Sequence, residues 1–158
     1  MVEYAFHDVY VAHLEAACRT AAAEPRQPVL TAGAGVYDDF DPAILLRGDW
    51  ERTTQFEGAF AHTISFTDTP GAEIAFAFEG GELTYVCTRA PNRGKAAVTI
   101  DGRDLGTVDL YSAAVQWRSR ARYPLLGPGR HVLAIRVLGE SRAAAEGKFV
   151  DVDSLEVR

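Results

Sequence analysis

The chain has 158 residues, of which 47% are hydrophobic, and its formal net charge is −6. This apolar content is enough for one buried core, which excludes a largely disordered chain. The acidic balance disfavours nucleic-acid binding, because phosphate backbones are bound by clustered Lys and Arg side chains. The N-terminus shows no basic region followed by an apolar run, and we therefore expect neither a signal peptide nor a membrane span.

The first predicted element is an amphipathic α-helix. Tyr10, Leu14 and Ala17 recur at helical spacing, and the Ala-rich run 16–23 favours a helix that ends before Pro25. Pro and Gly then punctuate the chain, which predicts a helix at 1–24, a linker or lead-in at 25–37 and one domain at 38–158. Three roles remain open for the helix: packing on that domain, self-association, or ending an upstream domain.

From Ile44 onward the hydrophobic period changes to two, as a strand with one buried face requires. The alternating segments lie at 72–78, 83–87, 96–100, 108–110, 131–137 and 149–157. Asp101-Gly102 predicts a tight hairpin turn between two of them. Short strands separated by turn residues indicate an all-β fold, an antiparallel β-sandwich or barrel, since no crossover helix fits between them.

Several short motifs occur in a defined order along this predicted domain. They are Asp38-Asp39-x-Asp41-Pro42, Gly48-x-Trp50, Gly71-Ala72, Phe76-x-Phe78-x-Gly80, Pro91-Asn92-Arg93-Gly94, Asp101-Gly102, Thr107-Val108-Asp109-Leu110-Tyr111-Ser112 and Val150-Asp151-Val152-Asp153. This order resembles bacterial carbohydrate-binding-module-like jelly rolls of the galactose-binding-domain-like group. The resemblance covers residues 37–158 and implies a jelly-roll sandwich of a kind often fused to glycoside hydrolases or other carbohydrate-active enzymes.

A sugar site combines an aromatic platform with planar groups that carry several hydrogen-bond donors. The residues that supply such groups near strand ends are the predicted ligand-binding set: Asn92, Arg93, Tyr111, Gln116 and Trp117. Each has a structural alternative. Tyr111 could anchor a loop through its hydroxyl, Arg93 could pair with a carboxylate, and Trp117 alternates in phase with Val115 and could pack in the core.

The resemblance also implies a structural calcium ion, which acidic side chains near the two ends of such modules hold. Asp38 and Asp41 at the start of the domain, with Asp151 and Asp153 near its end, would supply hard oxygen ligands, and Asp39 lies beside the first pair. The alternative is that Asp41 begins a turn before Pro42 while the two later aspartates face solvent or satisfy loop amides.

These observations lead to a functional expectation. No Gly-x-Ser-x-Gly or His-Glu-x-x-His motif occurs. We expect a noncatalytic carbohydrate-binding accessory module, not itself an enzyme, that targets an associated catalytic domain to a glycan. The alternatives are a structural or protein-interaction domain, one version of which is a homodimer through the N-terminal helix, and an esterase-like enzyme on the same scaffold. Location outside the cell is expected if the chain is cut from a longer secreted protein, and in the cytoplasm otherwise.

Overall fold

The computed structural model describes residues 27–124 and 126–158, and the predicted N-terminal helix lies outside them. The described part is all-β, as predicted, apart from one 3₁₀ turn at Phe60–His62. Its strands are β1 (Thr31–Ala32), β2 (Gly35–Asp38), β3 (Ile44–Arg47), β4 (Glu51–Thr53), β5 (Ile64–Thr67), β6 (Glu73–Glu79), β7 (Glu82–Arg89), β8 (Lys95–Ile100), β9 (Arg103–Asp109), β10 (Gln116–Pro124), β11 (Arg130–Val137), β12 (Val150–Val152) and β13 (Ser154–Val157).

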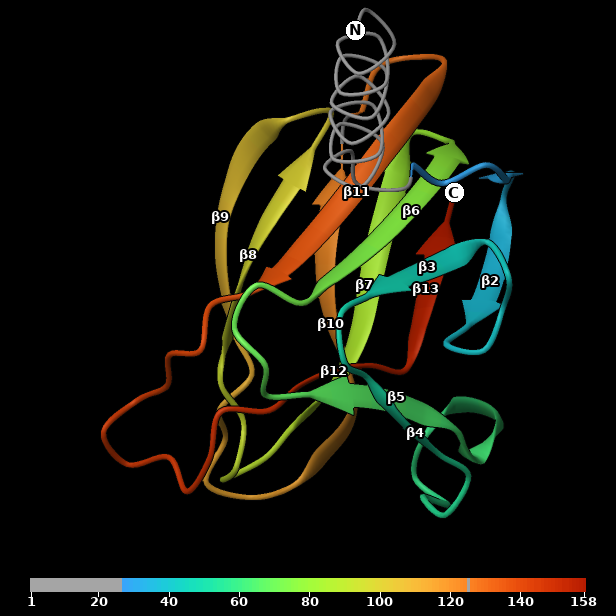
Figure 1. Ribbon diagram of the computed structural model, residues 1–158. Helices are drawn as coiled ribbons and strands as arrows, with labels where there is room; N and C mark the ends of the chain where they lie inside the picture. Colours follow the sequence, from blue (N-terminus) through green and yellow to red (C-terminus); the bar gives the residue numbers. More distant parts are fainter. Residues whose placement is uncertain (1–26, 125) are drawn as a thin grey trace, which may run out of the picture.

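The described strands form two main sheets and a smaller third one (Figure 1). The first has the order β1-β6-β11-β8-β9, with β3 also paired to β6, and the second has the order β10-β7-β13-β2. Strands β12, β5 and β4 form the third sheet. All the pairs are antiparallel except the short β1–β6 pair, so the predicted antiparallel β-sandwich is confirmed at this level.

The core lies between the two main sheets and follows from the alternation in the sequence. Phe76 and Leu133 in the first sheet and Tyr85 and Leu155 in the second are all fully buried members of one hydrophobic cluster. Burying such side chains stabilises the fold by about 1.5–3 kcal/mol each. The period-two pattern therefore specifies which face of each strand meets the opposite sheet.

The predicted hairpin turn is present between β8 and β9. Asp101 has φ 53° and Gly102 has φ 73°. Positive φ at both central residues is the conformation that makes Asp-Gly a favoured hairpin turn. Ile100 pairs directly with Arg103 across it.

The final predicted strand, 149–157, is in fact divided into two. β12 pairs with β5 in the small sheet, whereas β13 lies between β7 and β2 in the second main sheet. The chain changes sheets at Asp153, whose backbone carbonyl accepts a hydrogen bond from the Asp39 amide at 3.2 Å. The fold thus brings the beginning and the end of the domain together, as the calcium expectation required.

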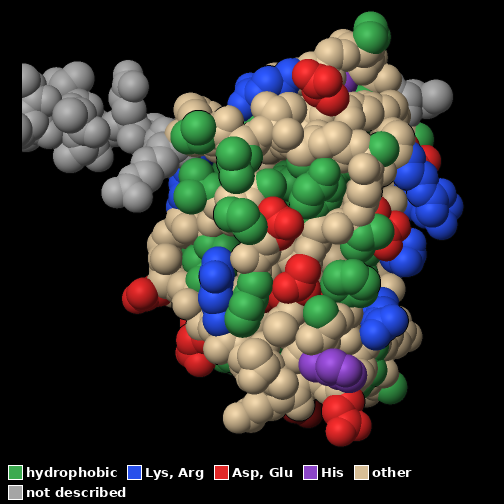
Figure 2. Space-filling view, turned by 90° about the vertical axis from the view of Figure 1, so that its right-hand side faces the viewer, with side chains coloured by type: hydrophobic (Ala, Val, Ile, Leu, Met, Phe, Trp, Pro, Cys, Tyr) green, Lys and Arg blue, Asp and Glu red, His purple; other side chains and the backbone are tan. Residues whose placement is uncertain are grey.

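Strand β2 is an edge strand of the second sheet. On the face of the molecule that includes this edge, hydrophobic side chains lie among acidic ones (Figure 2). Val36 of β2 is exposed. Charged side chains at a sheet edge oppose pairing with another chain, so a single exposed valine here is an ordinary surface feature. Within the described residues, no helix is long and apolar enough to cross a membrane.

Candidate functional site

Two of the predicted ligand-binding residues come together at the end of β7. Tyr111 forms a bridge with Ala90, and Gln116 pairs with Arg89. Both therefore lie beside consecutive residues of the same chain segment. Gln116 is exposed, so its amide group is available to hydrogen-bond a ligand.

Trp117 lies on the surface and not in the core, because β10 is irregular at this point. The pairing of β10 with β7 shifts register between Gln116 and Ser119, and Arg118 has φ 54°. Such a bulge changes which face of the sheet a side chain occupies. The alternation of Trp117 with Val115, which suggested that Trp117 packs in the core, is therefore not a reliable guide here. The Trp117 side chain is 38% exposed.

The exposed indole packs against a loop that precedes the 3₁₀ turn. The rings of Phe56 and Trp117 have centroids 5.4 Å apart at 41°, and Phe56 is also partly exposed. Gly58 permits this approach, since a Cβ atom there would lie 2.4 Å from indole carbons. We call the surface formed by Phe56, Val115, Gln116 and Trp117 the aromatic edge.

Arg118 fixes the loop beneath the aromatic edge. Its guanidinium donates hydrogen bonds to the carbonyls of Gly58 and Ala59, each at 3.1 Å. The loop that carries Phe56 is thus tied to the start of β10. A pair of aromatic rings held in this way loses little conformational freedom on binding and can stack on the apolar face of a sugar.

Tyr111 is placed differently from the aromatic edge. The Arg142 guanidinium lies 5.4 Å from the centre of its ring, and Arg142 Nε pairs with Asp109 Oδ2 at 2.6 Å. Burial favours the protonated form of Asp109, but hydrogen bonds from Arg142 and the Tyr111 amide outweigh it and hold its pKa below the usual value. One face of the tyrosine ring is therefore covered by a cation.

The predicted ligand residues Asn92 and Arg93 form an internal network. Arg93 is 8% exposed; its Nε lies 2.7 Å from Asp151 Oδ2, and its terminal nitrogen donates to Asn92 Oδ1 at 2.8 Å. The Thr88 amide donates to the other oxygen of Asp151 at 2.8 Å. This is the arrangement that the alternative interpretation of Arg93 described, a guanidinium paired with a buried carboxylate.

The predicted calcium ligands are dispersed among separate contacts. Asp151 is engaged by Arg93, and Asp41 accepts a hydrogen bond from the Ala43 amide at 2.8 Å, as in a turn. Asp38 accepts a hydrogen bond from the Phe40 amide, and its Oδ1 lies 2.8 Å from the Thr63 hydroxyl oxygen, whose single hydrogen it shares with Asp39. These three carboxylates thus already have protein partners.

Asp39 and Asp153 form a buried acidic pair. Both oxygens of Asp39 accept hydroxyl hydrogen bonds at 2.6 Å, from Thr63 and Ser65. Asp153 Oδ1 accepts from the Phe60 amide at 2.7 Å, whereas the buried Oδ2 has no partner in the described part of the chain. Burial, with a smaller contribution from neighbouring carboxylates, raises the pKa of each to about 6.

Only part of the predicted set fits a calcium ion. Calcium takes six to eight oxygen ligands. Among the described residues, no group of three or more His, Cys, Asp or Glu side chains is arranged to hold a metal. The unpartnered oxygen of Asp153 and the nearby Asp39 are the part of the donor set that suits a cation. Calcium therefore stays a prediction, restricted to this pair.

The known proteins that this chain resembles include carbohydrate-active enzymes. No family model matches the chain. The chain is 28% identical over 99 residues to the A type blood N-acetyl-alpha-D-galactosamine deacetylase of Flavonifractor plautii; the match covers 62% of this chain and 13% of that protein.

Solved structures share the fold at low sequence identity. A Paenibacillus xanthan lyase matches 85% of this chain and 14% of its own, with a TM-score of 0.59 and 12% identity. A two-domain esterase active on acetylated mannans, crystallised with mannopentaose, matches 78% of this chain and 36% of its own, also with a TM-score of 0.59 and 12% identity. The chain thus spans a minor part of each protein that it resembles.

The relatives contradict the expectation that the chain is not itself an enzyme. The sequence relative is a deacetylase, and the structural neighbours include carbohydrate esterases and a lyase. The absence of familiar catalytic motifs misled, because short motifs identify only the enzyme classes that use them. The chain is a β-sandwich that resembles parts of carbohydrate-processing proteins.

Proposed function

We propose that the chain is a glycan-recognition domain of a carbohydrate-active enzyme, with a jelly-roll sandwich that binds sugar at the aromatic edge. One observation carries the proposal: Phe56 and Trp117, from distant parts of the chain, are held side by side and partly exposed. Carbohydrate-processing relatives support a sugar as the ligand. A catalytic domain elsewhere in the parent protein is the partner this role requires.

The chemistry of the aromatic edge suits a neutral sugar. The two rings provide an apolar surface for C–H groups, and the Gln116 amide adds both a donor and an acceptor at its margin. The guanidinium of Arg118 is directed to backbone carbonyls instead. A shallow site of this kind binds weakly, and tethering to an enzyme compensates by raising the local concentration of substrate.

The test compares two exposed aromatic residues in the full chain. Trp117→Ala removes half of the ring pair, whereas Phe40→Ala removes a similarly exposed ring, 38% exposed, that lies under the Arg52 guanidinium. Binding is measured by calorimetry to N-acetylgalactosamine and mannopentaose. We expect at least a tenfold loss for Trp117→Ala and none for Phe40→Ala. Equal retention by both folded variants would refute the site.

The relatives favour a second candidate, hydrolysis of sugar acetyl groups with this chain contributing to the reaction. Its test is acetate release from N-acetylgalactosamine and from acetylated mannan by the full chain. Turnover above the spontaneous rate would establish that candidate. Binding without turnover would leave recognition as the role of this chain.

A further inference from the structure

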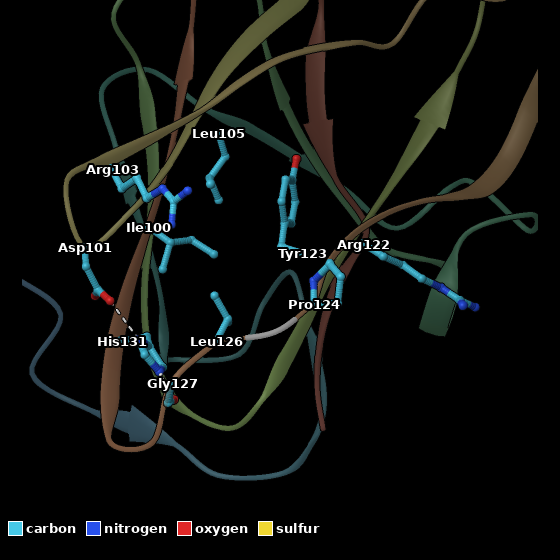
Figure 3. Close-up of a pocket in the computed structure, with 10 residues that line it drawn as sticks. All are labelled: Ile100, Asp101, Arg103, Leu105, Arg122, Tyr123, Pro124, Leu126, Gly127 and His131. Atoms are coloured by element: carbon cyan, nitrogen blue, oxygen red, sulfur yellow. Dashed lines mark hydrogen bonds and ion pairs between the residues drawn. The ribbon is translucent and has the colours of Figure 1, made fainter.

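A cavity of about 660 Å³ opens at the opposite end of the sandwich from the aromatic edge. It is bordered by the β8–β9 turn, the end of β10 and the segment before β11 (Figure 3). Trp117 is at the start of β10 and Tyr123 near its end, six residues further on, which corresponds to about 20 Å. A ligand in this cavity would bind independently of one at the aromatic edge.

Apolar and polar side chains both line the cavity. Leu105, Leu126 and Ile100 lie around the open space together with the ring of Tyr123 (Figure 3). Burial raises the pKa of Tyr123 to about 12, so its phenol is neutral. The volume lies in the range of small-molecule sites, which combine an apolar wall with a few polar groups.

The acidic residue of the cavity is neutralised internally. His131 Nδ1 lies 2.7 Å from Asp101 Oδ2, and Nε2 lies 2.6 Å from the Gly127 carbonyl oxygen. Both neighbours are acceptors, and only a doubly protonated imidazolium can donate to both. Its positive charge therefore offsets the charge of Asp101. These two residues form a closed pair with no net charge.

The positive charge of Arg103, which borders the cavity, has no such partner among the described residues. The guanidinium of Arg103 turns towards the open space (Figure 3). It makes no hydrogen bond or ion pair with any residue that the structure describes. Arg122 also borders the cavity, but its side chain extends away from the other lining residues. A cavity with an apolar wall and one unpaired guanidinium directed into it is suited to a ligand that has an apolar face and a carboxylate, which arginine binds in bidentate geometry.

We propose that this cavity is a second binding site, for a sugar that carries a carboxylate, with Arg103 as the residue that recognises the acid group. The carboxylate requirement follows from the cavity itself, whereas a sugar as its carrier rests on the proposed function. The aliphatic wall and Tyr123 would contact the ring of the sugar. The site is distinct from the aromatic edge in position and in charge.

The experiment is a ¹⁵N–¹H NMR titration of the full chain with methyl glucuronide, methyl glucoside and propionate. The glucuronide should saturate, with shifts concentrated at residues 100–105, 122–124 and 126–131. Methyl glucoside should bind at least tenfold more weakly. Arg103→Met should weaken glucuronide binding at least tenfold, Arg103→Lys should retain part of it, and Arg136→Met, which changes an exposed arginine outside the cavity, should leave it unchanged.

Each alternative outcome has a definite meaning. No glucuronide binding, or binding that Arg103→Met leaves intact in a folded protein, would overturn the proposal. Propionate binding as tight as glucuronide binding would overturn the choice of a sugar while retaining the carboxylate site. Because Trp117→Ala should not affect this titration, failure here is distinguishable from failure at the aromatic edge.

Discussion

Replacing Arg93 by Met should destabilise the fold before it affects any ligand. Arg93 is the cationic partner of Asp151, which is fully buried, and their Nε and Oδ2 atoms are 2.7 Å apart. Removing one member of a buried ion pair leaves the other charge uncompensated and costs about 3–5 kcal/mol. The Thr88 amide would still donate a hydrogen bond to the carboxylate.

Urea denaturation at pH 7 measures this cost, and a double-mutant cycle isolates the interaction. Asp151→Asn removes the charge that Arg93 compensates, so the double variant should be less destabilised than the sum of the single variants by about 1–3 kcal/mol. Burial raises the pKa of Asp151 and Arg93 opposes that effect. The Arg93→Met deficit should therefore shrink in acid, as Asp151 becomes protonated.

A free energy of unfolding within about 0.5 kcal/mol of the wild type for Arg93→Met would refute this reasoning, as would additive single variants. Either result would support the prediction from the sequence that Arg93 is an exposed ligand-binding residue. Loss of glycan binding by an unstable Arg93 variant would not show that Arg93 contacts sugar. The stability measurement therefore has to precede any binding assay at this position.

Two further predictions concern ionisable groups. The pKa values of Asp39 and Asp153 are raised from 3.8 to about 6, so the stability that their protonated forms contribute is present below pH 4 and lost as pH rises through 6. Asp153→Asn should therefore raise Tm at pH 7.5 but not at pH 4.5. Millimolar calcium should raise the wild-type Tm only if the cation fits the pair. Hydrogen bonds to Asp101 and Gly127 raise the pKa of His131, so the stability that its charged form contributes is present below about pH 6.5 and is lost as pH rises through the pKa of His131 in the folded protein. His131→Phe should abolish this loss of unfolding free energy with rising pH in urea denaturation. An unchanged loss in His131→Phe would contradict the role given to His131.

The sequence was sufficient to predict most of the fold. Periodicity located the strands, and Asp101-Gly102 located a hairpin turn, because both signals are local. The meeting of the two ends of the domain followed from the family resemblance. The division of the last strand at Asp153 was missed, although the apolar residues change phase there, from Val150 and Val152 to Leu155 and Val157.

The candidate site was harder to predict because non-local contacts decide it. A β-bulge directs Trp117 to the surface, and the residue pattern around it does not predict that bulge. Phe56 becomes its neighbour only because a loop that is distant in the sequence packs there. Arg93 looked like a surface donor because Gly94 follows it and the loop is polar. Its partner Asp151 is far away in the sequence, so the buried ion pair could only be named as an alternative.

The indole N–H signals of the two tryptophans in the chain give the most direct test of recognition at the aromatic edge. Trp50 donates its indole hydrogen to the Arg47 carbonyl at 2.9 Å and packs against the core, whereas Trp117 is exposed beside Phe56. In a ¹⁵N–¹H titration with N-acetylgalactosamine and mannopentaose, at least one sugar should shift the Trp117 signal saturably and leave the Trp50 signal in place. Saturable sugar binding that leaves the Trp117 signal unchanged, or no binding of either sugar by the folded chain, would contradict the account.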